Sequence, residues 1–193
     1  MNNTSVYSGS GYNNNIAVSP TISQYPSSAV NFGVTIVGGT AGIAIWVDWN
    51  NDGDFADAGE TVYNSAAYMP TGLTTGSFTV PSGQAAGNYR MRVMTDWSAT
   101  SPSPCAFAGT RGEIEDYTFT VLTPPACTGT PTAGAVTVTP ASGIAGSTYA
   151  VTASGFTPAS GLTYQWQSNT SGAGWVNVGV ATSSYVALTG LTA

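Results

Sequence analysis

The chain has 193 residues, of which 42% are hydrophobic and only 6% are charged, and its formal net charge is −6. Its charged fraction is far below the typical value of about 25%, which suits an extracellular β protein whose surface consists of hydroxyls and amides. Three arginines and no lysine leave no basic patch for phosphates, so we exclude nucleic-acid binding. No run of about 18 apolar residues occurs, so we expect no membrane insertion. Residues 1–5 lack the charged and apolar segments of a signal peptide, so we expect the export signal to lie outside this sequence.

The periodicity of the first two thirds of the chain is typical of strands. Residues 116–122 alternate aromatic or apolar side chains with polar ones, which predicts a strand with one face in the core. We find no amphipathic helix pattern. The predicted fold class is all-β, an antiparallel β-sandwich. Its expected strands cover residues 30–37, 42–49, 61–64, 76–80, 89–97 and 116–122.

A change in composition predicts a second domain. No charged residue follows residue 122, and residues 123–126 contain two consecutive prolines, as in a short stiff linker. We therefore expect one domain over residues 1–122 and another over residues 127–193. The strands of the second are expected at residues 135–139, 148–154, 162–168, 175–178 and 184–188.

Residues 164–167 resemble the third strand of an immunoglobulin-like (Ig-like) domain, with Trp166 as its core tryptophan. Residues 127–193 are fewer than the roughly 100 residues of a complete Ig-type sandwich, so we expect a smaller, truncated one. Either the chain is a fragment at this point, or a neighbouring chain supplies a missing strand at an open edge.

The most unusual segment is residues 48–60, which hold five carboxylates. Oxygen-bearing side chains alternate along it, and Gly53 allows a sharp bend, so one tight loop could wrap its oxygens around a hard cation such as Ca²⁺. The pattern departs from an EF-hand because its glutamate falls one residue late and strands, not helices, flank it. Mg²⁺ fits less well because it needs near-octahedral geometry. The alternative is a solvated acidic turn without a metal. The expected metal ligands are Asp48, Asn50, Asp52 and Asp54, with Asp57 or Glu60 closing the shell.

A second acidic cluster occupies residues 112–117. Glu113 and Glu115 are expected to share the face of core-bound Tyr117, where a carboxylate needs a partner. Arg90 and Arg92 share one face of their own strand, so charge pairing of these arginines with Glu113 or Asp116 could fix two strands in register. Alternatively, Glu115 or Asp116 completes the calcium shell, and the two arrangements are compatible.

Two cysteines, Cys105 and Cys127, could form one disulfide in an oxidising compartment. The strand predicted between them could equally carry Cys127 far from Cys105. The sequence leaves this pairing open.

Residues 46–55, Trp-Val-Asp-Trp-Asn-Asn-Asp-Gly-Asp-Phe, and residues 112–117, Gly-Glu-Ile-Glu-Asp-Tyr, together resemble the GEVED domain. That family is named for a Gly-Glu-Val-Glu-Asp-Tyr signature, in which Ile114 here replaces the valine. Residues 89–94 are similar to the family's arginine-bearing strand, and the resemblance covers about residues 30–122. It implies a module of a large secreted or cell-surface protein, often of Bacteroidetes-type bacteria with type IX secretion. Residues 127–188 similarly resemble the Ig-like repeats that accompany such modules.

The function expected from these features is a non-catalytic, calcium-stabilised module for adhesion or structural spacing at a bacterial surface. Without histidine or lysine, and with its acids clustered or facing arginines, the chain lacks the usual catalytic groups. Its expected partners are neighbouring modules of the same protein and a surface glycan or protein. One alternative is a carbohydrate-binding accessory module of a secreted hydrolase or peptidase, with Trp49, Trp97 or Trp175 stacking on sugars. Another is a self-associating subunit of a surface fibre joined by strand complementation.

Overall fold

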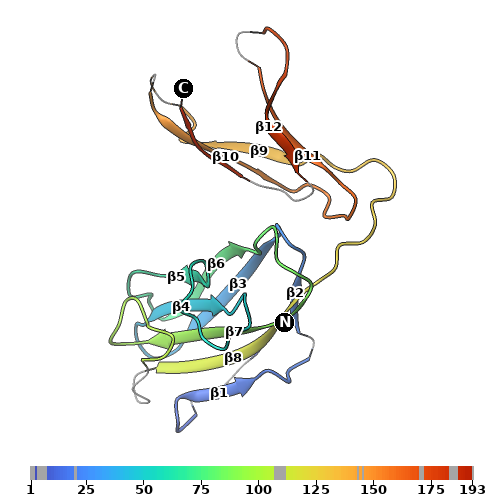
Figure 1. Cartoon of the computed structure of the whole chain (residues 1–193). Coiled ribbons are helices and arrows are strands. Elements are labelled where there is room, and N and C mark those ends of the chain that lie inside the picture. Colours follow the sequence, from blue (N-terminus) through green and yellow to red (C-terminus); the bar gives the residue numbers. More distant parts are fainter. Residues whose placement is uncertain are drawn as a thin grey trace. The chain divides into compact units, whose positions relative to one another are not determined.

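Figure 1 shows the computed structural model of the chain, which describes residues 3, 8–19, 21–106, 112–142, 144, 146–169, 172–182 and 187–192. The described residues form thirteen strands and no helix, which confirms the predicted all-β class. No helix long and apolar enough to cross a membrane therefore occurs among them. The chain divides into two compact units. The first comprises Met1–Gln24, Ala29–Val80 and Gln84–Leu122, and the second comprises Tyr25–Ser28, Pro81–Gly83 and Thr123–Ala193.

The first unit contains a six-stranded sheet and a two-stranded sheet. The large sheet has the order β1-β8-β7-β4-β5, with β2 also paired to β8. β1 and β2 run parallel to β8, whereas the other neighbours are antiparallel. Its strands are β1 (Tyr12–Asn15), β2 (Ile22–Gln24), β4 (Gly42–Val47), β5 (Thr61–Asn64), β7 (Gly87–Asp96) and β8 (Gly112–Val121). The small sheet pairs β3 (Ala29–Ile36) with β6 (Gly72–Thr79) in antiparallel register.

The main core of this unit lies between the two sheets, as in a β-sandwich. Alternate side chains of β4, β7 and β8 pack there against β3 and β6, because successive side chains of a strand point to opposite faces. Its buried members include Ile45, Val47, Met91, Tyr117, Phe119, Val121 and Phe78.

Strand β4 is buried on both faces. Ile45 and Val47 face the main core, whereas Ala44 and Trp46 join Met94, Ile114 and Phe55 in a second cluster on the outer face of the large sheet. This explains why all six residues of β4 are apolar or glycine and buried. Phe55 comes from the acidic loop after β4, so the loop is anchored on the outer face of the sheet.

The second unit contains two small antiparallel sheets. One has the order β13-β10-β9, and the other pairs β11 with β12. None of its described residues is fully buried, and Trp166, expected at a core centre, is half-buried. The expected strand over residues 184–188 falls mostly on residues outside the described ones. The strands are β9 (Ala135–Thr139), β10 (Thr148–Ser154), β11 (Tyr164–Ser168), β12 (Val176–Thr182) and β13 (Leu188–Thr192).

Candidate metal centre

The acidic loop, residues 48–60, connects β4 to β5, and both of its ends are fixed by backbone hydrogen bonds. The Val47 amide donates to the Glu60 carbonyl at 2.9 Å, and the Asp48 amide donates to the Arg90 carbonyl of β7, also at 2.9 Å. The loop therefore starts and ends at adjacent points of the large sheet. Between these points, side chains of the loop itself accept hydrogen bonds from its backbone.

Asp48 folds the first half of the loop. Its side chain is only 3% exposed. Oδ1 accepts a hydrogen bond from the Asp52 amide at 3.2 Å, and Oδ2 accepts one from the Gly53 amide at 3.1 Å. Gly53 has φ 97°, in the left-handed region that glycine adopts without strain. Both oxygens of Asp48 thus accept from the turn itself.

Glu60 closes the loop from its other end. Its side chain is 1% exposed, with Oε1 accepting from the Trp49 amide at 2.9 Å and Oε2 from the Asp57 amide at 3.3 Å. Burial raises the pKa of the Glu60 carboxyl, the two amides oppose that rise, and the charges of Asp48 and Asp57 add to it. Glu60 therefore stabilises the loop conformation by accepting hydrogen bonds from two of its amides.

Between these two side chains, a series of local hydrogen bonds orients the exposed ones. Asn50 Oδ1 accepts from the Asp52 amide at 3.0 Å and Asp52 Oδ1 from the Asp54 amide at 3.1 Å. Asp54 Oδ1 accepts from the Ala56 amide at 2.8 Å. Side chains that accept from the backbone two residues ahead form Asx turns, which hold the loop tightly wound.

These turns bring three carboxylates together. Asp52, Asp54 and Asp57 are all exposed, and each offers an oxygen within 4.8 Å of the others. Asn50 Nδ2 donates to Asp52 Oδ2 at 2.9 Å and to Asp57 Oδ2 at 2.6 Å, so an electropositive N–H group lies between two of them. Hydrogen bonds from the Asp54 amide, and then from Asn50, lower the pKa of the Asp52 carboxyl. In the part of the chain that the structure describes, no ion pair involves the three.

The expected ligands therefore separate into two groups. Asp52, Asp54 and Asp57 lie together with Asn50, whereas Asp48 and Glu60 use their oxygens to hold the loop. The structure corrects the assignment of Glu115. It lies opposite Val93 in the β7–β8 ladder and lines a groove on the face turned towards β3. The loop, by contrast, packs on the outer face through Phe55.

Of the expected charge pairs, the one between Arg92 and Asp116 is formed, because the register places these two residues opposite each other. Glu113 lies opposite Thr95 instead. Arg92 Nε donates to Asp116 Oδ1 at 2.7 Å and Nη2 donates to Oδ2 at 2.8 Å. Asp116 is 1% exposed, so this is a buried bidentate pair. Arg90 is exposed opposite Thr118, and the ion pairs found among the described residues do not include it.

Glu113 and Glu115 find neutral partners on the other face of β8. Glu113 Oε1 accepts from the Ser8 amide at 3.2 Å and from Asn13 Nδ2. Glu115 Oε2 accepts from the Tyr117 hydroxyl at 2.5 Å. Burial raises the pKa of both the Glu113 carboxyl and the Tyr117 phenol.

The contact between the two acidic motifs was not predictable from either motif alone. The Arg92 guanidinium carbon lies 5.0 Å from the centroid of the Phe55 ring, and Arg92 Nη1 donates to the Pro104 carbonyl at 2.8 Å. Arg92 thus touches the acidic loop through Phe55 and holds Asp116 of the hexapeptide. The one available signal was an aromatic residue, Phe55, in an otherwise polar loop.

Both cysteines are free thiols in the structure: Cys105 is exposed and Cys127 half-buried. The two cysteines belong to different units, so the pairing that the sequence left open stays a prediction.

One family model matches the part of the chain that carries the two acidic motifs. Residues 42–120 match the model of the GEVED domain. The matched range runs from the first residue of β4 almost to the end of β8, and it includes the acidic loop, Arg92 and Asp116. The resemblance is therefore confirmed for this part of the chain. No curated protein matches the chain.

Proposed function

We propose that this chain is a non-catalytic module of a secreted or cell-surface protein, stabilised by calcium at the acidic loop and serving adhesion or structural spacing. The observation that carries the proposal is the group of Asp52, Asp54 and Asp57, whose oxygens lie within 4.8 Å of one another. Like charges this close repel, and within the described loop the neutral side chain that bridges two of them is that of Asn50. A cation would relieve this repulsion far better than an amide does.

The donor set fits calcium. All three carboxylates offer hard oxygens, and the Asn50 amide would add a fourth if its carbonyl turned towards the ion. Ca²⁺ accepts six to eight oxygen ligands in flexible geometry, whereas Mg²⁺ demands near-ideal octahedral geometry. Exposed carboxylates leave room for water to fill the remaining positions. Asp52, Asp54 and Asp57 would hold the ion, while Asp48 and Glu60 would hold the loop that presents them.

Calcium would stabilise the fold by linkage. An ion that binds the folded chain and not the unfolded one adds about 2.7 kcal/mol to the free energy of unfolding when its free concentration is 100 times Kd. The loop joins two neighbouring strands and packs through Phe55, so its order is coupled to the large sheet. A Kd of ~10⁻⁴ to 10⁻³ M, as in extracellular modules, would leave the site filled only where calcium is abundant. The low charge content and the GEVED match support an extracellular setting, where calcium is abundant.

Thermal melting with and without EGTA tests this proposal. The unmodified chain should melt at a clearly higher temperature in millimolar calcium than in EGTA. Asp57→Asn should lose most of this difference, because it removes one ligand charge. Glu113→Gln is a matched control, since it removes one carboxylate on the other side of the large sheet and should keep the full difference. Equal melting temperatures in both buffers for the unmodified chain would eliminate calcium stabilisation.

A carbohydrate-binding role is the second candidate, favoured by exposed aromatic side chains. Trp97 and Trp175 are 64% and 69% exposed, as a stacking platform requires. Trp49 is unsuitable because its ring packs edge-on against Tyr89 and Phe119, each with a centroid distance of 5.6 Å. A glycan array probed with the chain, Trp97→Ala and Trp175→Ala tests this role. Specific binding lost in one variant would support it, and a blank array would remove it.

A further inference from the structure

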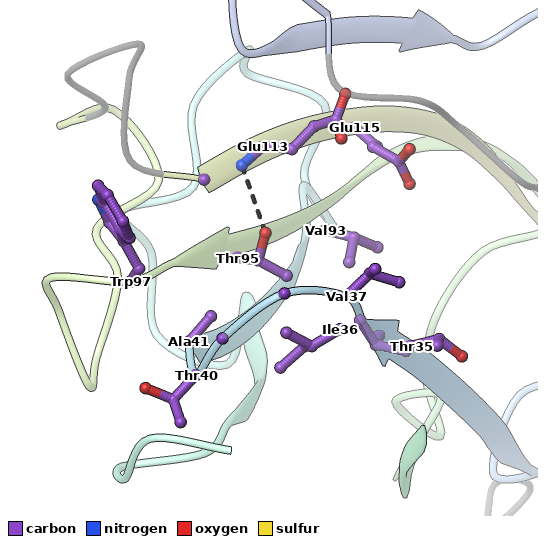
Figure 2. A pocket seen from close by; sticks show the side chains of 14 residues that line it. Thr35, Ile36, Val37, Thr40, Ala41, Val93, Thr95, Trp97, Glu113 and Glu115 are labelled. Atoms are coloured by element: carbon purple, nitrogen blue, oxygen red, sulfur yellow. Dashed lines mark hydrogen bonds between the residues drawn. The ribbon is translucent and has the colours of Figure 1, made fainter. Parts of the chain in front are cut away.

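A groove runs along the large sheet beside β3. Two adjoining cavities of about 490 and 630 Å³ share Val34, Thr35, Val37, Val93 and Glu115, so they form one continuous depression. Figure 2 shows Thr35, Ile36 and Val37 on one side of it, with Thr95 of β7 and Glu113 and Glu115 of β8 on the other. The groove exists because the small sheet has two strands and covers only part of the six-stranded one.

One wall of the groove is a strand edge. Among the described strands, β3 pairs only with β6. Every residue from 30 to 37 except Ile36 lines the 630 Å³ cavity, and Ile36 lines the other. Successive side chains of a strand point to opposite faces, so an uninterrupted run of lining residues means that the backbone edge itself borders the groove. An unpaired edge offers a row of N–H and C=O groups to another strand.

The floor of the groove contains a half-buried carboxylate, that of Glu115, for which the described residues supply no cation. Glu115 Oε2 accepts from the Tyr117 hydroxyl, but Oε1 is buried and has no hydrogen-bond partner among the described residues. Both described arginines, Arg90 and Arg92, lie opposite Thr118 and Asp116, on the outer face of the sheet. A buried carboxylate oxygen without a partner is costly, and a positively charged ligand group would relieve that cost.

We propose that this groove binds an extended peptide segment, which adds a strand to the free edge of β3 and places a lysine or arginine side chain on Glu115. Backbone hydrogen bonds to β3 would supply affinity for any extended chain, and the Glu115 carboxylate would select a basic residue at one position. A neutral sugar would use neither the backbone edge nor the charge. The proposal goes beyond the calcium-stabilised module and does not depend on calcium.

A peptide array tests the proposal with the full chain. The probes are peptides of eight residues, the length of β3, built of alternating Thr and Val and scanned at each position with Lys, norleucine or Glu. We expect one register in which Lys binds about 10-fold more tightly than norleucine, the size expected for a charge-assisted hydrogen bond. Glu115→Gln should remove this preference, because the glutamine side chain can still accept from Tyr117 but carries no charge. The affinity of this variant for the norleucine peptide should be unchanged.

Backbone methylation tests the added strand without changing the protein. Two versions of the best Lys peptide, methylated on alternate amide nitrogens of one edge or the other, should differ sharply, since only one of them can still pair with β3. The proposal is overturned if both versions bind like the parent peptide, or if the Lys preference survives in Glu115→Gln. Absence of binding to every peptide, or binding only to a neutral hexasaccharide with loss in Trp97→Ala, would overturn it as well.

Discussion

Asp116 and the aspartates of the acidic loop belong to the same folded unit, but their charges are balanced in different ways. Asp116 is buried and held by two hydrogen bonds from Arg92. Asp52, Asp54 and Asp57 are exposed and adjacent, and none of them is in the ion pair found among the described residues. A carboxylate that must be buried carries its counter-charge within the fold, because an unpaired buried charge is very costly. Exposed carboxylates can take their counter-charge from solution.

The buried pair offers the largest test of this contrast. Arg92→Ala leaves Asp116 buried without its cation, and we expect a loss of about 3–5 kcal/mol in the free energy of unfolding. Urea denaturation at neutral pH measures it. Arg90→Ala is the matched control, because Arg90 is exposed on the same strand and should change stability by less than about 0.5 kcal/mol. Similar losses of unfolding free energy in the two variants would mean that the buried Arg92 stabilises the fold no more than the exposed Arg90 does.

The contact between the two acidic regions is the next test. Phe55→Ala removes a buried ring that packs on Trp46, with centroids 6.5 Å apart, and lies under Arg92. We expect a loss of about 3 kcal/mol, near the lower end for phenylalanine truncation because a loop can move into the space. Calcium affinity should fall together with stability, since Phe55 fixes the loop on the sheet. Unchanged calcium affinity would show that the loop holds its geometry without this anchor.

Asp48 tests the bracing within the loop. Asp48→Asn keeps the size of the side chain, but its amide group can no longer accept from both the Asp52 and Gly53 amides. We expect a loss of about 1–2 kcal/mol, because one buried amide loses its acceptor. Thermal and urea denaturation in EGTA measure it without a contribution from calcium. A variant as stable as the parent chain would assign Asp48 to the ion rather than to the loop.

The sequence predicted those strands whose pattern is local. β4 is an apolar run, and β5, β9 and β10 have the expected bounds. β1 and β2 were missed because they are short and their sequences, Tyr-Asn-Asn-Asn and Ile-Ser-Gln, are mostly polar. They are strands only through parallel pairing with β8, about a hundred residues away.

The sequence predicted which residues belong to the candidate site more accurately than it predicted how they are arranged. Alternating oxygen side chains identified the loop, but Asp48 and Glu60 differ from their neighbours only in burial, which depends on the folded sheet. The partner of Arg92 depends on strand register, and a shift of one residue exchanges the two faces of a strand. That is why Asp116, and not Glu113 or Glu115, faces Arg92.

The smallest expected effect concerns pH and Glu113. Burial raises the pKa of Glu113 above its ordinary value of 4.5. The protonated Glu113 carboxyl therefore contributes stability that is fully present below its pKa in the unfolded chain. This contribution is lost as the pH rises through its higher pKa in the folded chain. The unfolding free energy of Glu113→Gln, relative to the unmodified chain, should increase as the pH rises above about 4.5. Urea denaturation across this range in EGTA measures the difference, and a difference independent of pH would contradict the burial of this carboxyl.

We propose that the exposed aspartates of the acidic loop bind a calcium ion, whereas the buried Asp116 is neutralised by Arg92 and needs no ion. Isothermal titration of calcium into the full chain, Asp54→Asn and Arg90→Ala tests it most directly. We expect one ion per unmodified chain with a Kd of ~10⁻⁴ to 10⁻³ M and the same binding in Arg90→Ala. Asp54→Asn, which lacks one charged ligand, should bind calcium at least about 10-fold more weakly. Absence of binding to the unmodified chain, or equal affinity in Asp54→Asn, would contradict it.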